Sequence, residues 1–519
     1  MDLRRVTEIS KVFIEEGLGW GPQSEAEGLG SGESAAAEPS ADVQRAAKLR
    51  RALERLGPTF VKFGQLLATR VDLFSEGFLQ ELGKLRSHVP PFPAAEARRI
   101  VEQETGRPLE DVFSVFPEEP VASASIAQVY KAQLRATGEW VAVKVQRPKL
   151  AQTITSDLAV LMEVSRFVDR LVPAYHRSMV HRVAMEYAAR ARQEISFLAE
   201  ANAMVRFQDV LGSLPEFRAP RVHLDLSTER LLVMEWFEGP LLDEIGGPTQ
   251  LRDMGLDPKS FASAMLRLQL VMSYEHGFVH GDTHAGNIIM LPDGKIGLID
   301  FGLHGDVPRQ LCDRMLELLF YQSWGRTDEA VKAFLRIFSP NAKLDSSAFE
   351  EELRRILSTT NTAPAGESRI TDQLVEGLRL GARYQLQAQS ELFVVIRNLA
   401  IVEGIVLAYC PDLDLAHEAR ETLGGILQRR AFGTFARGDL EPIIPLALLT
   451  LSQRPQLMDR VMRLARSFAD SSNLGEFLKH EGVFDHQKPV ERSPIALSLL
   501  LAGLAGAATA GLTYWLLVQ

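Results

Sequence analysis

One stretch, residues 280–302, limits the possible folds of this chain more than any other. It begins H-G-D-T-H-A-G-N and ends D-F-G. Between these ends lie two apolar runs and a turn: Ile288–Leu291, Ile296–Ile299 and Pro292–Lys295. The turn reads P-D-G-K, and proline, aspartate and glycine favour a tight connection between two strands. We therefore expect a β-hairpin that brings Asn287 and Asp300 side by side.

The polar residues of this stretch suit phosphoryl transfer. Asp282 and Asn287 are spaced as in the catalytic loop of protein kinases, and Asp300 follows within the D-F-G. The reaction needs a carboxylate near the nucleophile, and oxygen ligands that hold Mg²⁺ against the phosphates. We expect Asp282 to orient the nucleophile, and Asn287 and Asp300 to bind Mg²⁺. The loop also resembles that of small-molecule kinases of the aminoglycoside and choline type, so it predicts the fold class and leaves the substrate open.

Two upstream motifs predict a nucleotide cleft. The segment V-A-S-A-S-I-A-Q-V aligns with the glycine-rich loop of kinases but has Ala122, Ala124 and Ala127 at the glycine positions, followed by Val129. Alanine still lets phosphates approach the backbone, although it does not take the positive φ angles that glycine takes freely. The strand V-A-V-K then ends in Lys144, where the kinase lysine contacts the α- and β-phosphates. ATP and Mg²⁺ are therefore the expected cofactors.

A segment nearer the N-terminus has no counterpart in ordinary protein kinases. In L-G-P-T-F-V-K-F-G-Q-L-L-A-T-R-V-D-L, the residues Lys62, Gly64 and Gln65 lie among apolar neighbours, and P-P-F-P follows at Pro90–Pro93. By pattern alone, the lysine and the glutamine could be the polar edge of an amphipathic helix. Together these motifs resemble the UbiB/AarF family of atypical protein-kinase-like proteins, over about residues 45 to 345. The resemblance implies that this extension folds over the cleft, where Lys62 and Gln65 restrict access by protein substrates.

The same resemblance bears on the carboxylate that orients Lys144. The family pattern E-x-D-F-x-x-E-A-x-N corresponds to E-I-S-F-L-A-E-A-N-A in this chain. We therefore assign the role to Glu194, with Glu200 as a second polar contact, while Glu163 on the preceding helical stretch is an alternative. Ser196 stands where the family has aspartate, which leaves the function of that carboxylate open here.

Two further segments complete the expected kinase-like fold. The run R-L-L-V-M-E-W-F-E-G resembles the hinge between the lobes, so backbone groups near Met234 and Phe237 would meet the adenine. After Gly302 no A-P-E motif follows, and Leu303–Gln310 leads quickly into a helix. We therefore expect no long activation segment, which is the usual platform for a protein substrate.

The last stretch of the chain predicts a membrane anchor. Ile495–Val518 carries no charged residue and is long enough to cross a bilayer with some tilt. Gly503, Ala507 and Gly511 form a small-residue stripe that permits a homodimer through this helix. We expect a single-pass C-terminal anchor with membrane lipids as partners. Two basic residues just before it favour a cytoplasmic catalytic part.

Composition argues against two other classes of protein. The net charge of -10, with no basic stripe, argues against a nucleic-acid partner. Cys312 and Cys410 lack C-x-x-C spacing, so neither a zinc site nor a disulfide framework is expected.

The expected fold is α+β: an atypical bilobal protein-kinase-like fold with a helical K-x-G-Q extension before it and extra helices after it. Residues 1–20 predict an amphipathic helix that packs on the protein, and residues 21–44 predict a flexible linker because they offer almost nothing to bury. The other expected parts are the helical extension 45–118, the N-lobe 119–240, the C-lobe 241–345, a helical region 346–490 and a transmembrane helix 495–518.

These observations favour a membrane-anchored kinase or ATPase of the UbiB type that binds Mg-ATP. The resemblance implies support of isoprenoid quinone (ubiquinone) biosynthesis, with proteins of that pathway or prenylated quinone intermediates as partners. Two alternatives stay open. One is a protein or small-molecule kinase with an unidentified acceptor, and the other is a non-catalytic, nucleotide-regulated scaffold that binds lipid.

Overall fold

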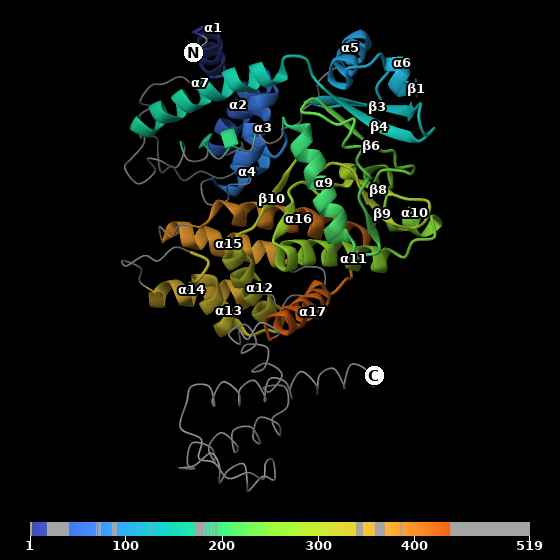
Figure 1. Ribbon diagram of the computed structural model, residues 1–519. Helices are drawn as coiled ribbons and strands as arrows, with labels where there is room; N and C mark the ends of the chain where they lie inside the picture. The colour runs from blue at the N-terminus through green and yellow to red at the C-terminus, as the bar shows by residue number, and fades with distance from the viewer. Residues whose placement is uncertain are drawn as a thin grey trace, which may run out of the picture. The chain divides into compact units, whose positions relative to one another are not determined.

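A computed structural model describes most of the chain up to residue 435. The described residues are 3–17, 41–68, 70, 74–85, 91–124, 126–171, 181, 184–185, 187–189, 191, 195–338, 346–358, 369–384, 386 and 388–435. Most of the predicted linker and the whole predicted transmembrane helix lie outside these ranges. The chain divides into two units, residues 1–420 and 421–519, and the architecture below is that of the first unit (Figure 1).

A five-stranded antiparallel sheet forms the first lobe, with the strand order β1-β3-β4-β6 and β2 paired to β3. Its strands are β1 Phe113–Val115, β2 Ala122–Ser123, β3 Ala127–Leu134, β4 Trp140–Gln146 and β6 Leu231–Glu235. Helix α5, Ala94–Thr105, buries Ile100, and helix α6, Leu109–Val112, buries Val112, in the same core as Val143 of the sheet. The lobe therefore begins before the predicted boundary at residue 119, because these helices cover the sheet.

Helix α9, Phe197–Leu211, packs on β6 and reaches toward the second lobe. The Ser196 hydroxyl caps its start by accepting a hydrogen bond from the Ala199 N–H at 3.1 Å. Serine and aspartate are both good N-caps. A serine where the family has aspartate is therefore compatible with the start of this helix.

The second lobe is built around the predicted hairpin, which is confirmed. Strands β8, Ile288–Met290, and β9, Ile296–Leu298, pair antiparallel, and the Ile299 N–H donates to the Asn287 carbonyl at 3.1 Å. The other short elements here are β5 Phe217–Arg218, η1 Leu242–Glu244, α10 Pro248–Asp253, α11 Pro258–Leu270, η2 Val271–His276, β7 Phe278–His280, η3 Ala285–Asn287 and β10 His304–Asp306. After β10, α12 begins at Arg309, so the short activation segment is also confirmed.

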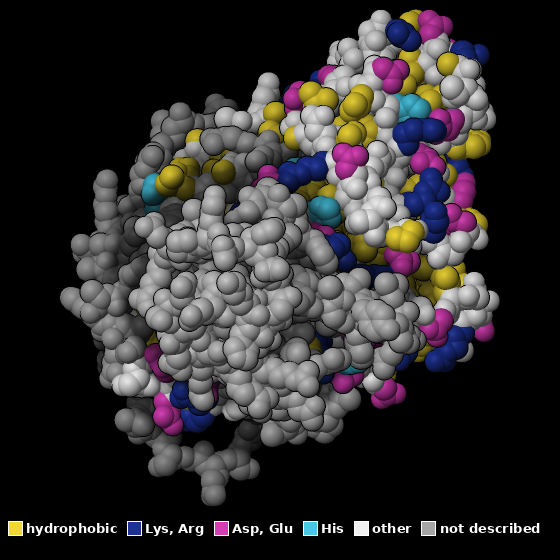
Figure 2. Space-filling view, turned by 60° about the horizontal axis from the view of Figure 1, so that its bottom comes forward, with side chains coloured by type: hydrophobic (Ala, Val, Ile, Leu, Met, Phe, Trp, Pro, Cys, Tyr) yellow, Lys and Arg dark blue, Asp and Glu magenta, His cyan; other side chains and the backbone are white. Residues whose placement is uncertain are grey.

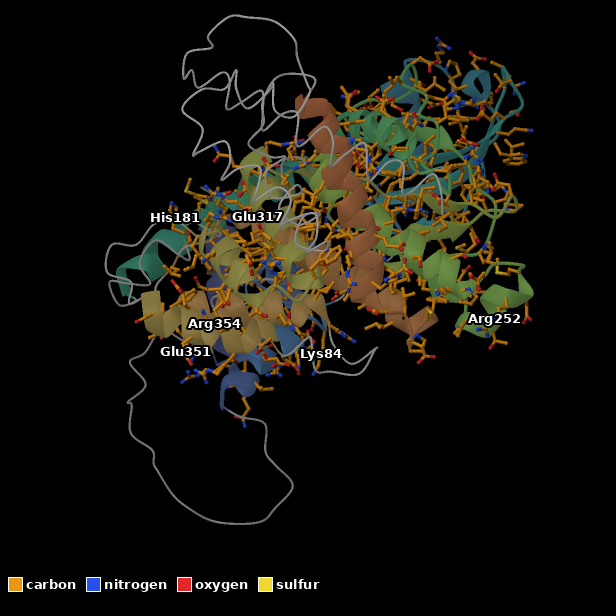
Figure 3. The ribbon with its side chains drawn as sticks, turned by 90° about the horizontal axis from the view of Figure 1, so that it is seen from below. Lys84, His181, Arg252, Glu317, Glu351 and Arg354 are labelled. Atoms are coloured by element: carbon orange, nitrogen blue, oxygen red, sulfur yellow. The ribbon has the colours of Figure 1, made fainter. Side chains whose placement is uncertain are left out.

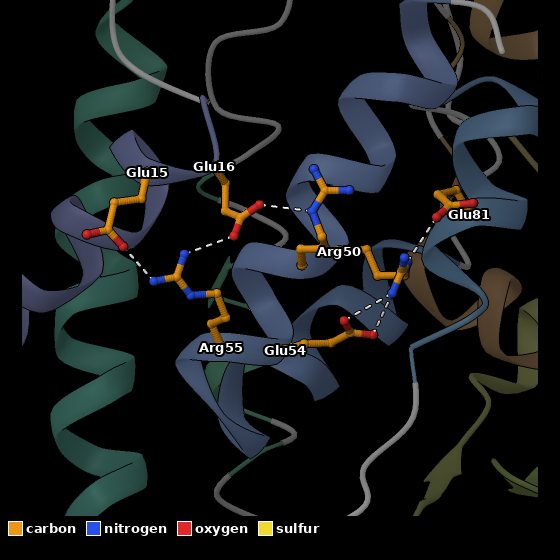
Figure 4. Close-up of polar contacts among 7 residues, drawn as sticks. Glu15, Glu16, Arg50, Glu54, Arg55 and Glu81 are labelled. Atoms are coloured by element: carbon orange, nitrogen blue, oxygen red, sulfur yellow. Dashed lines mark hydrogen bonds and ion pairs between the residues drawn. The ribbon is translucent and has the colours of Figure 1, made fainter. Parts of the chain in front are cut away.

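The N-terminal extension forms a helical group with one helix inserted after β4. Its helices are α1 Leu3–Glu15, α2 Ala41–Leu56, α3 Pro58–Leu67, α4 Glu76–Leu82 and α7 Leu150–Leu171. Helix α1 contacts α2 and α7 and buries Ile9 and Val12. Figure 4 shows Arg55 of α2 paired with Glu15 and Glu16 at the end of α1. The prediction that this amphipathic helix packs on the protein is confirmed.

The remaining helices of the described part follow the second lobe. They are α12 Arg309–Ser323, α13 Thr327–Leu335, α14 Ser346–Ser358, α15 Ile370–Arg383, α16 Ser390–Tyr409 and α17 Leu415–Phe435. Figure 3 shows the underside of these helices, where Arg354 pairs with Asp328 and Glu317 pairs with Arg336 at the surface. Basic and acidic side chains are also interspersed over the described part of the face in Figure 2.

Helix α16 is the most apolar of the described helices. Among the described residues, only its stretch Glu391–Tyr409 is long and apolar enough to cross a membrane, with a mean hydropathy of 1.9. In this structure, however, α16 packs along α11, and Leu399, Val402 and Val406 are at most 1% exposed. It is therefore a buried helix that packs against the second lobe.

Candidate functional site

The site is centred on Lys144, which leaves β4 toward the cleft between the lobes. In the antiparallel register, Lys144 lies opposite Val129, so strand pairing aligns the two motifs that the sequence predicted. Its ammonium donates to both carboxylate oxygens of Glu200, at 2.8 and 3.0 Å. Asp300 of the D-F-G lies 3.5 Å from the same nitrogen. One buried cation thus joins the sheet, α9 and the second lobe.

Charge pairing controls the protonation of this group. Burial disfavours a charge on Lys144, but the carboxylates of Asp300 and Glu200 raise the pKa of its amine above the usual range. Desolvation likewise opposes ionisation of Asp300, yet the Lys144 ammonium and the Gly302 N–H hold the pKa of this carboxyl well below its usual range. Burial raises the pKa of Glu200, against the pull of Lys144. Asp300 is therefore ionised at neutral pH, the state in which a carboxylate suits a cation.

The structure describes one of the predicted partners of Lys144. Glu200 in the first turn of α9, which the sequence analysis gave as a second polar contact, makes the paired contact. Glu194 lies outside the described residues, so its role stays a prediction. Glu163 lies on α7, among the helices of the extension, and its side chain is likewise not described.

Asp282 and Asn287 lie in the catalytic loop, which we define as residues 280–287. The Asn287 amide nitrogen donates to the Asp282 carbonyl at 3.0 Å, so its side-chain oxygen is the atom suited to a metal. The Asp282 N–H donates to Nδ1 of His280 at 3.2 Å. Burial lowers the pKa of His280, so this ring is neutral and acts as an acceptor that shapes the loop.

The oxygen atoms of Asp300 and Asn287 suit Mg²⁺, which is seldom bound by protein ligands alone. Among the described residues, no group of three histidine, cysteine, aspartate or glutamate side chains is placed to hold a metal. Mg²⁺ typically binds one or two carboxylates, with phosphate oxygens and water as its other ligands. Asp300 and Asn287 supply this kind of partial ligand set.

The alanine-rich loop is closed by its own backbone and by an arginine that the sequence analysis missed. Ala122 pairs with Val129, and the Ala124 N–H donates to the Ala127 carbonyl at 2.8 Å. Arg147, just after β4, donates through Nε to the Ala124 carbonyl and through Nη2 to Ser123 Oγ, both at 2.9 Å. The Ala124 N–H is thus used within the loop. Nucleotide recognition here would depend on other groups.

The segment predicted as the hinge, residues 230–239, contains strand β6. Met234 is buried opposite Ala142 in the β4–β6 ladder, and Phe237 packs on the hairpin residue Ile289. The Trp236 N–H donates to the Trp140 carbonyl at 3.1 Å. The Trp236 N–H is therefore used within the sheet. An adenine in the cleft would have to bond other backbone groups of this segment.

The extension contributes directly to the cleft. Lys62 and Gln65 of α3 line the same pocket as Asp282 and Asp300, and the Lys62 charge also helps to lower the pKa of Asp300. Gly64 lies between them on the opposite side of α3. A Cβ there would lie 2.6 Å from Leu53 of α2 and 2.4 Å from Leu85. Gly64 thus allows the close packing that holds the two polar residues at the cleft.

Helix α16 supplies two residues that no motif predicted. Arg397 lines the pocket and donates to Oδ1 of Asp282 at 3.2 Å, and Asn398 accepts a hydrogen bond from the Thr283 N–H at 3.3 Å. The signal was an arginine and an asparagine within a largely apolar helix. Buried polar groups need partners, and here the partners belong to the catalytic loop.

Comparisons with known proteins support the kinase-like fold. Residues 84–333 match the ABC1 atypical kinase-like domain. The chain is 33% identical over 378 residues to Protein ACTIVITY OF BC1 COMPLEX KINASE 3, chloroplastic, of Arabidopsis thaliana, which covers 71% of this chain and 51% of that protein. It is 30% identical over 433 residues to the protein named Probable protein kinase UbiB of Aeromonas salmonicida, which covers 82% of this chain and 78% of that protein.

A solved structure shows the same fold. The Rv3197 protein of Mycobacterium tuberculosis, solved in complex with erythromycin, aligns with a TM-score of 0.51 and 24% identity over 73% of this chain and 95% of that one. The chain spans about half the length of its Arabidopsis relative and of an uncharacterized Synechocystis relative, at 51% and 55%.

Proposed function

The chain belongs to the UbiB/AarF family of ABC1 atypical kinase-like proteins, and from this premise we propose that it binds Mg-ATP between its lobes and transfers the γ-phosphate to water or to a small acceptor. The Lys144 contact with Glu200 and Asp300 carries the proposal. It supports the proposal because the Lys144 ammonium would suit the α- and β-phosphates and the neighbouring Asp300 carboxylate would suit Mg²⁺. Bound Mg²⁺ would neutralise charge on the phosphates.

The residues of the chain have distinct parts in this proposed reaction. Lys144 would orient the phosphates, and Asp300 with the Asn287 side-chain oxygen would hold the metal. Asp282 would accept a hydrogen bond from the attacking hydroxyl or water. Lys62 and Arg397 would face the γ-phosphate from outside the kinase-like core, since both line the pocket that contains Asp282.

The surroundings of Asp282 favour water or a small acceptor over a protein substrate. Helix α3 covers the pocket with Lys62 and Gln65, and α16 covers it with Arg397. Only a short connection separates Gly302 from α12, so the usual docking platform of protein kinases is lacking in this part of the chain. A protein kinase activity would need movement of the extension.

We further propose that the chain acts at a membrane in support of isoprenoid quinone (ubiquinone) biosynthesis. The predicted transmembrane helix 495–518 and the 30% sequence identity to a protein named Probable protein kinase UbiB support this part of the proposal. Lipids, quinone-pathway proteins and prenylated intermediates are the proposed partners.

The decisive experiment measures phosphate release from ATP by the full chain in vesicles of anionic lipid, with and without Mg²⁺. We expect Mg²⁺-dependent release that falls at least about 100-fold in Asp282→Asn and changes in Lys62→Ala. The matched control is Asp293→Asn, which makes the same change in the exposed hairpin turn. Nucleotide binding without release under any condition would favour the nucleotide-regulated scaffold, and a phosphorylated acceptor would favour the kinase.

A further inference from the structure

The catalytic loop is held from outside the kinase-like core by helix α16. Asn398 is 1% exposed, and its Oδ1 accepts the Thr283 N–H at 3.3 Å. The preceding residue, Arg397, contacts the Asp282 carboxylate. Arg397 thus contacts the side chain of Asp282, and the next residue of α16, Asn398, contacts the backbone of the next loop residue, Thr283.

The Asn398 side chain is itself fixed by a chain of buried polar groups. Its Nδ2 donates to Oε1 of Gln269, and Nε2 of Gln269 donates to Ser273 Oγ at 3.0 Å. Gln269 is 2% exposed and Ser273 is fully buried. An amide turned the other way would set donor against donor in a site without water access, which costs free energy. Because the Thr283 N–H is a donor, the Asn398 oxygen faces Thr283 and the Asn398 amide nitrogen faces the Gln269 oxygen.

This polar chain ends in an unusual segment. Ser273 lies in η2, a π-helix at residues 271–276 that continues α11 and leads into β7 and the catalytic loop. Single π-helical turns are rare in proteins overall, but those that occur are frequently found at functional sites. The loop is therefore connected to this turn twice, once through the backbone and once through Gln269 and Asn398.

A second polar contact links the same helix to the C-terminal helical region. The Glu403 carboxylate on α16 accepts the N–H groups of Ile370 and Thr371, at 3.1 and 3.2 Å, at the start of α15. Helix α16 thus contacts the catalytic loop through Asn398 and α15 through Glu403. A shift of α15 has a direct route to the loop.

We propose that Asn398 is a positioning residue for phosphoryl transfer, which holds Asp282 in place through the Thr283 backbone and makes the loop dependent on α16. The inference rests on the proposed function for its kinetic consequence. Its structural consequence, the protection of the Thr283 amide, is independent of any turnover.

The test compares Asn398→Ala and Gln269→Ala with Val402→Ala, a fully buried apolar residue of α16, in the full chain. The measurements are kcat, the Kd for ATP, and hydrogen exchange of the loop amides. We expect Asn398→Ala to lower kcat about 10- to 100-fold, with the Kd for ATP changed less than about twofold. Exchange at the Thr283 amide should be about tenfold faster.

The other variants separate positioning from general stability. Gln269→Ala should shift both readouts in the same direction but less, since Asn398 remains. Val402→Ala should lower the stability and leave kcat per folded molecule unchanged. Asn398→Asp, which keeps the acceptor oxygen, should restore protection of the Thr283 amide.

Equal losses of kcat in Asn398→Ala and Val402→Ala, or unchanged exchange at Thr283, would overturn the proposal. A wild-type protein without turnover would instead contradict the proposed function, and the exchange experiment would still decide the role of Asn398.

Discussion

The N-terminal extension and helix α16 each bring a cation to the same pocket, Lys62 from α3 and Arg397 from α16. Their polar attachments differ. Helix α1 is joined to α2 by Arg55, which is 44% exposed, and by its acidic partners. Helix α16 is joined to its neighbours by Asn398 and Glu403, which are 1% and 0% exposed. Exposed ion pairs are screened by salt, whereas buried polar contacts are not. The contact between α1 and α2 should therefore weaken as the salt concentration rises, whereas the contacts of Asn398 and Glu403 should not.

The largest expected effect concerns Glu403 and pH. Burial raises the pKa of this carboxyl to about 7, even though Thr371 and Ile370 donate hydrogen bonds to it. The folded state therefore binds a proton more tightly than the unfolded state. The resulting stability is fully present below about pH 4.5 and is lost as pH rises through 7, a total of about 3 kcal/mol.

This prediction is checked by urea unfolding of the wild type and Glu403→Gln between pH 5 and 8. The difference in unfolding free energy between the two proteins should shift against the wild type as pH rises, because only the wild type must bury a charge. Parallel pH profiles would show that Glu403 does not titrate in this range.

The next effect concerns the cation of α16. Arg397→Met should lower turnover of ATP about 10- to 100-fold, because the variant removes a positive charge beside Asp282 where the γ-phosphate would lie. Steady-state phosphate release measures this effect. Arg383→Met, which removes an exposed arginine that pairs with Glu352, is the matched control, and an equal loss in both variants would rule out a local role for Arg397.

Substitutions at two glycines test how tightly the extension and α16 are packed. Gly64→Ala in α3 should cost about 1–2 kcal/mol, because its Cβ would press on the buried Leu53 and Leu85. Gly404→Ala in α16 meets open space and should be neutral or stabilising by about 0.5–1 kcal/mol. Thermal unfolding of both variants measures the contrast. A stable Gly64→Ala protein would mean that α3 can move away from α2.

The smallest effect is expected at the surface of the extension. Arg55→Met removes the contacts with Glu15 and Glu16 (Figure 4). It should speed limited proteolysis of α1 only slightly at low salt, and the difference should disappear near 1 M salt. A difference that persists at high salt would show that Arg55 acts through packing.

The features that were predicted best from the sequence involve residues that are close together in the chain. The hairpin, the spacing of Asp282 and Asn287, and the alignment of Val129 with Lys144 depend on turn chemistry and strand pairing over short distances. The partner of Lys144 was harder to predict, because Glu194 and Glu200 belong to one motif and the pattern does not show which of them contacts the lysine.

The contribution of α16 could not be read from spacing at all. Asp282 and Arg397 are 115 residues apart, and nothing between them sets their approach except the packing of several helices. The sequence does contain one indication, namely charged and amide side chains within a largely apolar helix. Such buried polar groups need partners, so they mark α16 as a helix with polar contacts.

The composition of α16 also bears on how the chain is made. A helix this long and apolar resembles a segment that the membrane-insertion machinery of a cell would take into the bilayer. Arg397 near its middle would cost about 2.5–3.5 kcal/mol there, and Glu403 adds a further penalty. The residues that contact the catalytic loop and α15 would therefore also disfavour insertion of this helix into a bilayer, and a variant that makes α16 wholly apolar would lose this penalty.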